Sequence, residues 1–201
     1  RQPLEQTVYA VLLDGTNLLA ITRPTDLPHL RLIPSGSDLY GVEVELVSHP
    51  NRHEKLHQAL KEAAEDFDFV FVDCPPSLGL LTLNALCAAD SVIVPLQCEY
   101  YALEGLSYLI RTIDRVRSSV NPRLQIEGIL LTMFDGRNTL SRQVAEDVRK
   151  NFPGKVFNAV IPRNVRLSEA PSHGKPILLY DIGSRGCQSY VDLAREFLEM
   201  N

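Results

Sequence analysis

The stretch from Phe67 to Ser77 carries the clearest arrangement of residues for chemistry. Its apolar residues Phe69–Val72 predict a strand buried on both faces, and Asp73 follows at the carboxyl end of that strand. Pro75 and Pro76 end the strand and stiffen the turn. A carboxylate in this place can hold Mg²⁺ through water, because a hard cation keeps much of its hydration shell and needs an anionic anchor beside phosphates. The alternative is an aspartate that only caps the turn.

Two further strand exits bring arginines to loops. Residues 132–138 read TMFDGRN and residues 161–171 read IPRNVRLSEAP, and both follow apolar runs. Two such loops can jointly hold a base and present a basic rim to phosphates. Arg137 and Arg166 are the leading candidates for that rim, since we expect them on loops rather than amid paired charges, and Arg163 is a weaker candidate. The alternative is that these arginines only brace carboxylates of the pocket.

Other reactive side chains offer weaker patterns. Cys74 adjoins Asp73, and a neighbouring carboxylate raises the pKa of a thiol, which argues against a nucleophile. His53 and His57 are four residues apart and can share a helix face, but no clear further metal ligand is near, so a solvated surface is favoured. Residues 97–105 (QCEYYALEG) follow an apolar run and add polar groups at the same edge.

The elements that must position these residues alternate between apolar runs and segments of helical period. Continuous apolar runs predict the parallel strands Leu30–Ile33, Phe69–Val72, Val92–Val94, Gly128–Thr132 and Val156–Ile161. The predicted helices are His53–Glu65, Leu80–Ala88, Leu103–Ser118, Thr139–Lys150 (capped by Asn138) and Ser189–Glu199. The sequence therefore predicts an α/β fold with a doubly wound, mostly parallel sheet flanked by helices, in which ligands sit at the carboxyl ends of strands.

Composition narrows the class of protein. With 45% hydrophobic and 22% charged residues, the 201-residue chain is globular rather than disordered, collagen-like or coiled-coil. No repeat or long linker separates two cores, so we expect residues 1–201 to form a single domain. The apolar stretches fall far short of the roughly 20 residues of a membrane span, no signal peptide opens the chain, and four cysteines without a CxxC pair indicate a cytoplasmic protein.

Charge is distributed unevenly along the chain. Residues 1–100 carry 6 basic and 14 acidic side chains, whereas residues 101–201 carry 14 basic and 11 acidic ones. The second half is therefore the better place to expect an anionic partner, although an uneven solvated surface explains the charge counts equally well.

Four segments of the sequence resemble segments that occur in the same order in one known protein family. They are VDCPPSLGLLTLNAL, QCEYYALEG, TMFDGRN and IPRNVRLSEAPSHGKPI, and they extend over most of the chain. In these strings the chain resembles the ParA/Soj family of chromosome- and plasmid-partition ATPases. The resemblance implies a deviant Walker A P-loop ATPase that uses ATP and Mg²⁺, forms a homodimer around ATP, binds DNA without sequence preference and is stimulated by a ParB-type partner. It further implies a nucleoid-associated protein without membrane attachment.

The resemblance also assigns roles by position. Asp73 matches the family's Walker B aspartate, which implies a catalytic residue that holds Mg²⁺ through water. Met133 and Pro162 match the loops that enclose adenine, and Arg137 and Arg166 correspond to arginines implicated in DNA binding. Without the resemblance, Met133 and Pro162 read as ordinary turn and core residues.

The family's phosphate-binding loop does not occur in this sequence. Neither GxxxxGK[ST] nor GxGxxG is present, and we expect the KGGVGKT loop in a segment of roughly fifty residues ahead of Arg1. Because phosphoryl transfer depends on backbone N–H groups and lysine around the phosphates, we expect the parent protein to be an ATPase and the 201-residue chain to be inactive alone.

Two alternatives stay open at the level of sequence. One is a MinD-like membrane-positioning ATPase, which would be expected to end in a basic amphipathic helix, whereas residues 189–201 are net acidic. The other is a catalytically dead module that binds DNA or a partner.

Overall fold

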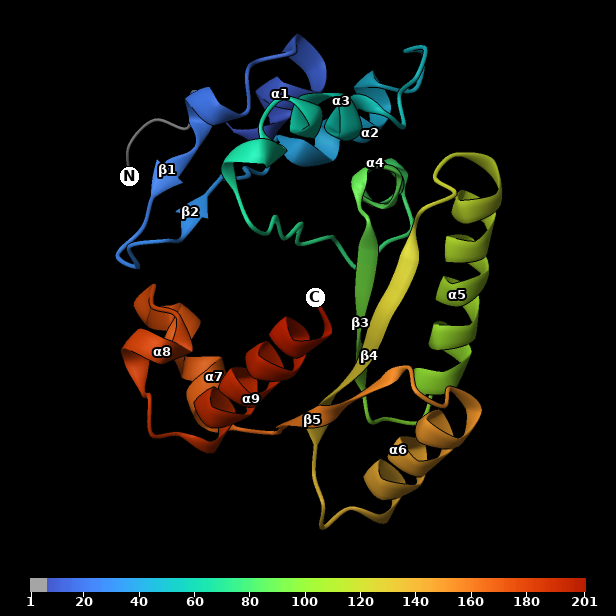
Figure 1. Cartoon of the computed structure of the whole chain (residues 1–201), viewed down its shortest axis with the longest axis vertical. Helices are drawn as coiled ribbons and strands as arrows, with labels where there is room; N and C mark the ends of the chain where they lie inside the picture. The colour runs from blue at the N-terminus through green and yellow to red at the C-terminus, as the bar shows by residue number, and fades with distance from the viewer. Residues whose placement is uncertain (1–6) are drawn as a thin grey trace. The chain divides into compact units, whose positions relative to one another are not determined.

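The computed structural model describes residues 7–201, and the chain divides into two compact units. Unit 1 comprises residues 1–90 and 115–124, and unit 2 comprises residues 91–114 and 125–201. Figure 1 labels the helices and strands of both. The expectation of a single domain over residues 1–201 stays a prediction.

Unit 2 is built on a parallel sheet of three strands in the order β3–β4–β5 (Figure 1). The strands are β3 (Ser91–Gln97), β4 (Gln125–Phe134) and β5 (Val156–Pro162). Gln97 pairs with Thr132 and Phe134 pairs with Pro162, so the three carboxyl ends are aligned by the register. This alignment places the loops after all three strands at one edge, where parallel α/β sheets bind ligands.

Helices connect and follow these strands. They are α5 (Ala102–Ser119), α6 (Thr139–Asn151), α7 (Val165–Glu169), the 3₁₀ helix η3 (Ala170–His173), α8 (Ile177–Tyr180) and α9 (Arg185–Met200). Leu130, Phe157 and Ile161 form a buried cluster against which Leu193 of α9 packs. Gly128 is required beneath that cluster, because a Cβ there would lie 2.5 Å from the Phe157 ring.

A bulge in β5 is held by a carboxylate of α9. Between the pairs Ile129–Val156 and Leu131–Val160, β5 contains two more residues than β4. The backbone N–H groups of Asn158 and Ala159 donate to the Glu196 carboxylate at 2.7 and 2.8 Å, and the Asn158 amide donates to it at 3.0 Å. Glu196 therefore satisfies two donors of the bulge and ties α9 to β5.

Unit 1 is mostly helical. Its elements are α1 (Val8–Asp14), η1 (Leu19–Ile21), β1 (Arg23–Pro24), β2 (Arg31–Leu32), α2 (Leu39–Glu45), α3 (Lys55–Lys61), η2 (Ala64–Asp66) and α4 (Leu80–Ala88). Its main core joins the helices α1, α2, α3 and α4 through the buried residues Leu12, Val42, Leu46, Leu56 and Ala85. The buried Asn84 donates to the carbonyls of Arg52 and Leu80 and accepts from the Leu56 N–H, so its amide links α4 to the start of α3.

The α/β class and most long elements are as the sequence predicts. The strands of unit 2 form in parallel order, and α4 has the predicted bounds. The α5 helix is one residue longer than predicted at each end, and α6 is one residue longer at its C-terminal end. Asn138 caps α6 by accepting from the Leu140 N–H at 3.0 Å. The last helix starts at Arg185, four residues before its predicted start, because Ser184 supplies the cap.

Two predicted parallel strands are wrong. Leu30–Ile33 contains only the two-residue β2, which is exposed and pairs antiparallel with β1. Phe69–Val72 belongs to neither of the two sheets in the described part of the chain, and its side chains are 42 to 72% exposed. An apolar run indicates that burial is favourable, but a strand forms only beside a second strand that exchanges backbone hydrogen bonds with it.

Candidate functional site

The carboxyl edge of the unit 2 sheet contains a hollow that Met133 lines. The hollow has a volume of about 440 Å³ and is lined by Cys98, Glu99, Tyr100, Met133, Asp135, Asn138, Leu140, Ser141 and Arg163. Met133 has a φ of 53°, in the left-handed region that costs a residue with a Cβ about 1–2 kcal/mol. Such conformations persist where surrounding structure imposes them, and they cluster at functional sites.

Pro162 lines a second hollow, of about 320 Å³. Phe134, Val160 and Pro162 form its apolar part, and Gly183, Arg185, Gln188, Ser189 and Asp192 complete it. The structure therefore places the two residues expected to enclose adenine, Met133 and Pro162, in different hollows of the same unit.

Arg137 is paired with Asp135 in the loop after β4. Its Nε and Nη2 atoms donate to the two Asp135 oxygens, each at 3.1 Å, and its backbone N–H donates to Oδ1 at 3.0 Å. The hydrogen bond from the Arg137 side chain holds the pKa of the Asp135 carboxyl below its ordinary value. Arg137 remains 92% exposed, so this pair is open to solvent.

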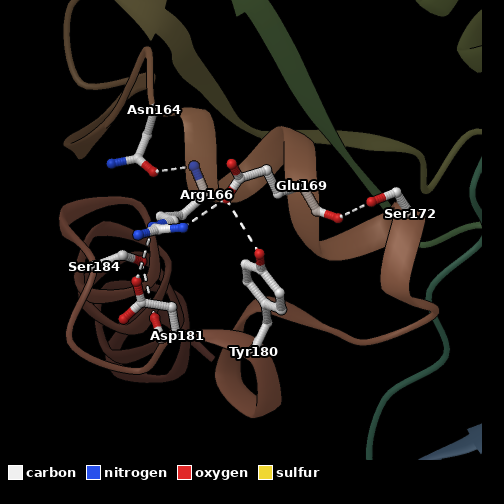
Figure 2. Close-up of polar contacts among 7 residues, drawn as sticks. All are labelled: Asn164, Arg166, Glu169, Ser172, Tyr180, Asp181 and Ser184. Carbon is white, nitrogen blue, oxygen red and sulfur yellow. Dashed lines mark hydrogen bonds and ion pairs between the residues drawn. The ribbon is translucent and has the colours of Figure 1, made fainter.

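Arg163 and Arg166 follow β5 and are also paired. Arg163 Nη2 lies 3.4 Å from Glu99 Oε1, in the loop after β3. The Asn164 side chain caps the start of α7 by accepting from the Arg166 N–H at 2.9 Å. Arg166 therefore lies in the first turn of this short helix. The Arg166 guanidinium lies 2.8 Å from the Glu169 carboxylate and 3.4 Å from that of Asp181. Figure 2 shows it between these two side chains.

The Glu169 carboxylate is further held by the Tyr180 hydroxyl, which donates to it at 3.2 Å. The hydrogen bond from Arg166 is the main reason that the pKa of Glu169 lies below its ordinary value, and the Tyr180 hydroxyl acts in the same direction. The expectation that the rim arginines lie away from paired charges is therefore wrong. Asp135 and Glu169 lie two and three residues from their arginines in the sequence. Glu99 and Asp181 come from elements that folding brings near, which spacing along the sequence does not reveal.

Asp73 lies in unit 1, in a segment that is neither helix nor strand, and it is exposed. The structure thus leaves its carboxylate accessible to a hydrated cation but does not place it at a strand end. Partial burial and then the Asp73 charge raise the pKa of the neighbouring Cys74 thiol, which argues further against a nucleophile. Among residues 7–201, no cluster of three or more His, Cys, Asp or Glu side chains has the arrangement to hold a metal, so His53 and His57 gain no third ligand.

The polar residues of α9 at the Pro162 hollow were not found from the sequence. Gln188, Ser189 and Asp192 lie more than twenty residues after Pro162, on a helix whose period indicates only amphipathic packing. Asp181 was missed for a similar reason, because fifteen residues and two short helices separate it from Arg166.

Comparisons with known proteins define first the class and then the family. A family model described as an AAA domain matches residues 1–126. The structure of cobyrinic acid a,c-diamide synthase from Mycobacterium smegmatis, with bound ADP and magnesium, is 38% identical with a TM-score of 0.82, over 98% of this chain and 73% of that one. This chain thus has a P-loop NTPase-like α/β fold.

Two curated relatives identify the family. The chromosome partitioning protein ParA of Myxococcus xanthus (strain DK1622) is 56% identical over 193 residues, which cover 96% of this chain and 68% of that protein. The sporulation initiation inhibitor protein Soj of Bacillus subtilis (strain 168) is 53% identical over 193 residues, covering 96% of this chain and 76% of Soj. The chain belongs to the ParA/Soj family of chromosome-partitioning ATPases. Within residues 7–201, no helix is both long and apolar enough to cross a membrane.

Proposed function

We propose that this chain is part of a partition ATPase that binds ATP with Mg²⁺, forms a homodimer when ATP is bound, and attaches to DNA without sequence preference. A ParB-type protein would stimulate its ATP hydrolysis, and the protein would be associated with the nucleoid in the cytoplasm. The observation that carries the proposal is a set of three arginines at one sheet edge: Arg137 in the loop after β4, Arg163 directly after β5, and Arg166 in the first turn of α7.

The Pro162 hollow fits the base of a nucleotide. Its volume of about 320 Å³ lies at the lower end of the range for small-molecule sites. Phe134 and Pro162 offer flat apolar surface to a base, while Gln188 and Ser189 offer hydrogen-bonding groups to its edge. The role of Met133 would be to shape the end of β4 from the other hollow, rather than to contact the base from the same side as Pro162.

Asp73 suits a water-mediated magnesium contact. Mg²⁺ keeps several waters and is commonly bound through one or two carboxylates together with substrate phosphates. A single exposed carboxylate is therefore sufficient on the protein side, and the absence of a three-ligand cluster in residues 7–201 is compatible with this role. Bound Mg²⁺ would neutralise phosphate charge, and Asp73 would fix the position of its waters.

Binding to the phosphates of DNA must come from a local surface of the protein, because the chain has a formal net charge of −5. Arg137, Arg163 and Arg166 supply exposed guanidinium groups to such a surface in unit 2, each of them beside a carboxylate. Contacts to phosphate carry no base information, which supports binding without sequence preference. In a dimer each contact would occur twice.

The test uses the protein with the phosphate-loop segment expected ahead of Arg1, which we call the extended protein. We expect it to hydrolyse ATP slowly, and faster with duplex DNA and the ParB-type protein of the same genome, whereas the 201-residue chain shows no activity above background. Substantial turnover by the 201-residue chain would contradict the proposal. Binding of the ATP-loaded protein to anionic vesicles instead of DNA would favour the MinD-like alternative.

A further inference from the structure

Arg166 lies in a cluster whose carboxylates outnumber its positive charge. Glu169 Oε2 and Asp181 Oδ2 lie 2.8 and 3.4 Å from the guanidinium, from the end of α7 and from the residue after α8 (Figure 2). With both acids ionised, Arg166, Glu169 and Asp181 together carry one net negative charge. The Arg166 side chain is 54% exposed, so an approaching phosphate reaches the guanidinium and meets this negative charge at the same time.

The two carboxylates differ in how they are held. Glu169 lies one helical turn after Arg166, makes the shorter contact, and accepts from the Tyr180 hydroxyl at 3.2 Å. It therefore neutralises Arg166 and fixes its direction. Asp181 makes the longer contact to Nε, and its backbone carbonyl, rather than its carboxylate, accepts from the Ser184 hydroxyl at 2.9 Å. The Asp181 charge is the surplus one.

We propose that Asp181 sets the affinity of Arg166 for phosphate by supplying a competing negative charge beside the guanidinium. The inference rests on the proposed DNA role of Arg166 and adds its control. Two unit charges about 6 Å apart in water interact strongly enough to change an affinity about threefold. The Asp181 carboxylate therefore weakens each Arg166–phosphate contact by about that factor, and a symmetric dimer bound through both sites is weakened about tenfold.

This arrangement makes DNA affinity sensitive to a small local change. Arg166 lies in α7 and Asp181 directly follows α8, and η3 between them ends at His173, before Gly174, whose φ is 63°. A displacement of Asp181 away from Arg166 raises affinity for phosphate without creating any new contact. The control acts on affinity alone, since phosphate contacts carry no sequence information.

The experiment titrates the ATP-loaded extended protein onto two unrelated DNA duplexes at low salt. Asp181→Asn keeps the shape of the side chain and removes its charge, so we expect binding about threefold to tenfold tighter for both duplexes. Asp181→Ser is a second variant with the same expected direction. Asp147→Asn, on the exposed face of α6, makes the same change of net charge and controls for the overall field, so it should shift affinity much less. A thermal melt of each variant confirms that it is folded.

The Arg166→Ala background separates this inference from the proposed function. If Asp181 acts through Arg166, Arg166→Ala weakens binding and Asp181→Asn gains little in that background. If Arg166→Ala weakens binding but Asp181→Asn leaves it unchanged, or tightens it equally with and without Arg166, the Asp181 inference is wrong and the DNA role of Arg166 stands. If Arg166→Ala itself has no effect, the DNA role of Arg166 fails, and the inference fails with it.

Discussion

Replacing Glu196 tests how α9 is joined to the sheet. The carboxylate accepts three hydrogen bonds, from the Asn158 N–H, the Ala159 N–H and the Asn158 side-chain amide, at 2.7, 2.8 and 3.0 Å. Hydrogen bonds to a charged group contribute about 1.5–3 kcal/mol each when water is excluded, but Asn158 is exposed and water can replace part of what is lost. We therefore expect Glu196→Ala to lower the free energy of unfolding by about 2 kcal/mol. Glu196→Gln, which keeps one carbonyl oxygen, should lower it by about 1 kcal/mol.

The assay is chemical denaturation followed by circular dichroism, with Glu199→Ala as the matched control. Glu199 lies on the exposed surface of the same helix, three residues after Glu196. Its replacement by Ala removes the same charge as Glu196→Ala. We expect its effect to stay within about 0.5 kcal/mol, as for surface positions generally. If Glu196→Ala were no more destabilising than Glu199→Ala, the carboxylate would not stabilise the β5 bulge.

Three further predictions concern single side chains. The carboxyl of Glu169 should titrate below its ordinary pKa in an NMR pH titration. Its contribution to stability is therefore complete above the ordinary pKa of 4.5 and is lost as the pH falls through the lower pKa of the folded protein. Arg166→Ala and Tyr180→Phe should each raise the pKa of Glu169, and an unchanged pKa in both variants would refute the two contacts. Asn84→Ala should lower the free energy of unfolding by about 2–3 kcal/mol, because it removes the side chain that pairs with the buried Leu56 N–H and the Arg52 carbonyl. A denaturation curve like that of the unmutated protein would contradict this. Asp73→Ala in the extended protein should reduce Mg²⁺-dependent ATP hydrolysis by several orders of magnitude, while the protein still melts cooperatively. A hydrolysis rate near that of the unmutated protein would show that Asp73 is a turn residue only.

The sequence predicts elements that depend on local signals and fails where distant segments must meet. The α4 helix has its predicted bounds, and the Asn138 cap is confirmed, since both depend on spacing within a few residues. Phe69–Val72 reads as a strand by the same rules, but a strand requires a neighbour that composition cannot supply. The α/β class could therefore be predicted, while membership of a particular strand in a sheet could not.

The site shows the same division. The segments that bear Arg137 and Arg166 are identified by their place after apolar runs, and the structure confirms that they follow β4 and β5, with Arg166 in helix α7 rather than on a loop. The Asp181 carboxylate that pairs with Arg166 was not predicted, because this contact depends on how α7 and α8 pack together. Long-range pairing of charges is fixed by tertiary structure, and spacing in one sequence does not encode it visibly.

The most direct test of the central claim is the salt dependence of DNA binding by the ATP-loaded extended protein. The slope of log K against log salt counts the phosphates neutralised, and each lost contact lowers its magnitude by about 1. Replacing Arg137, Arg163 and Arg166 together by Ala should lower the slope by about 3 for each subunit, about 6 for a symmetric dimer, and equally for two unrelated duplexes. Arg195→Ala, which breaks a similar pair with Asp192 near the middle of α9, should leave the slope unchanged. An unchanged slope in the triple variant, or a loss confined to one duplex sequence, would contradict the account.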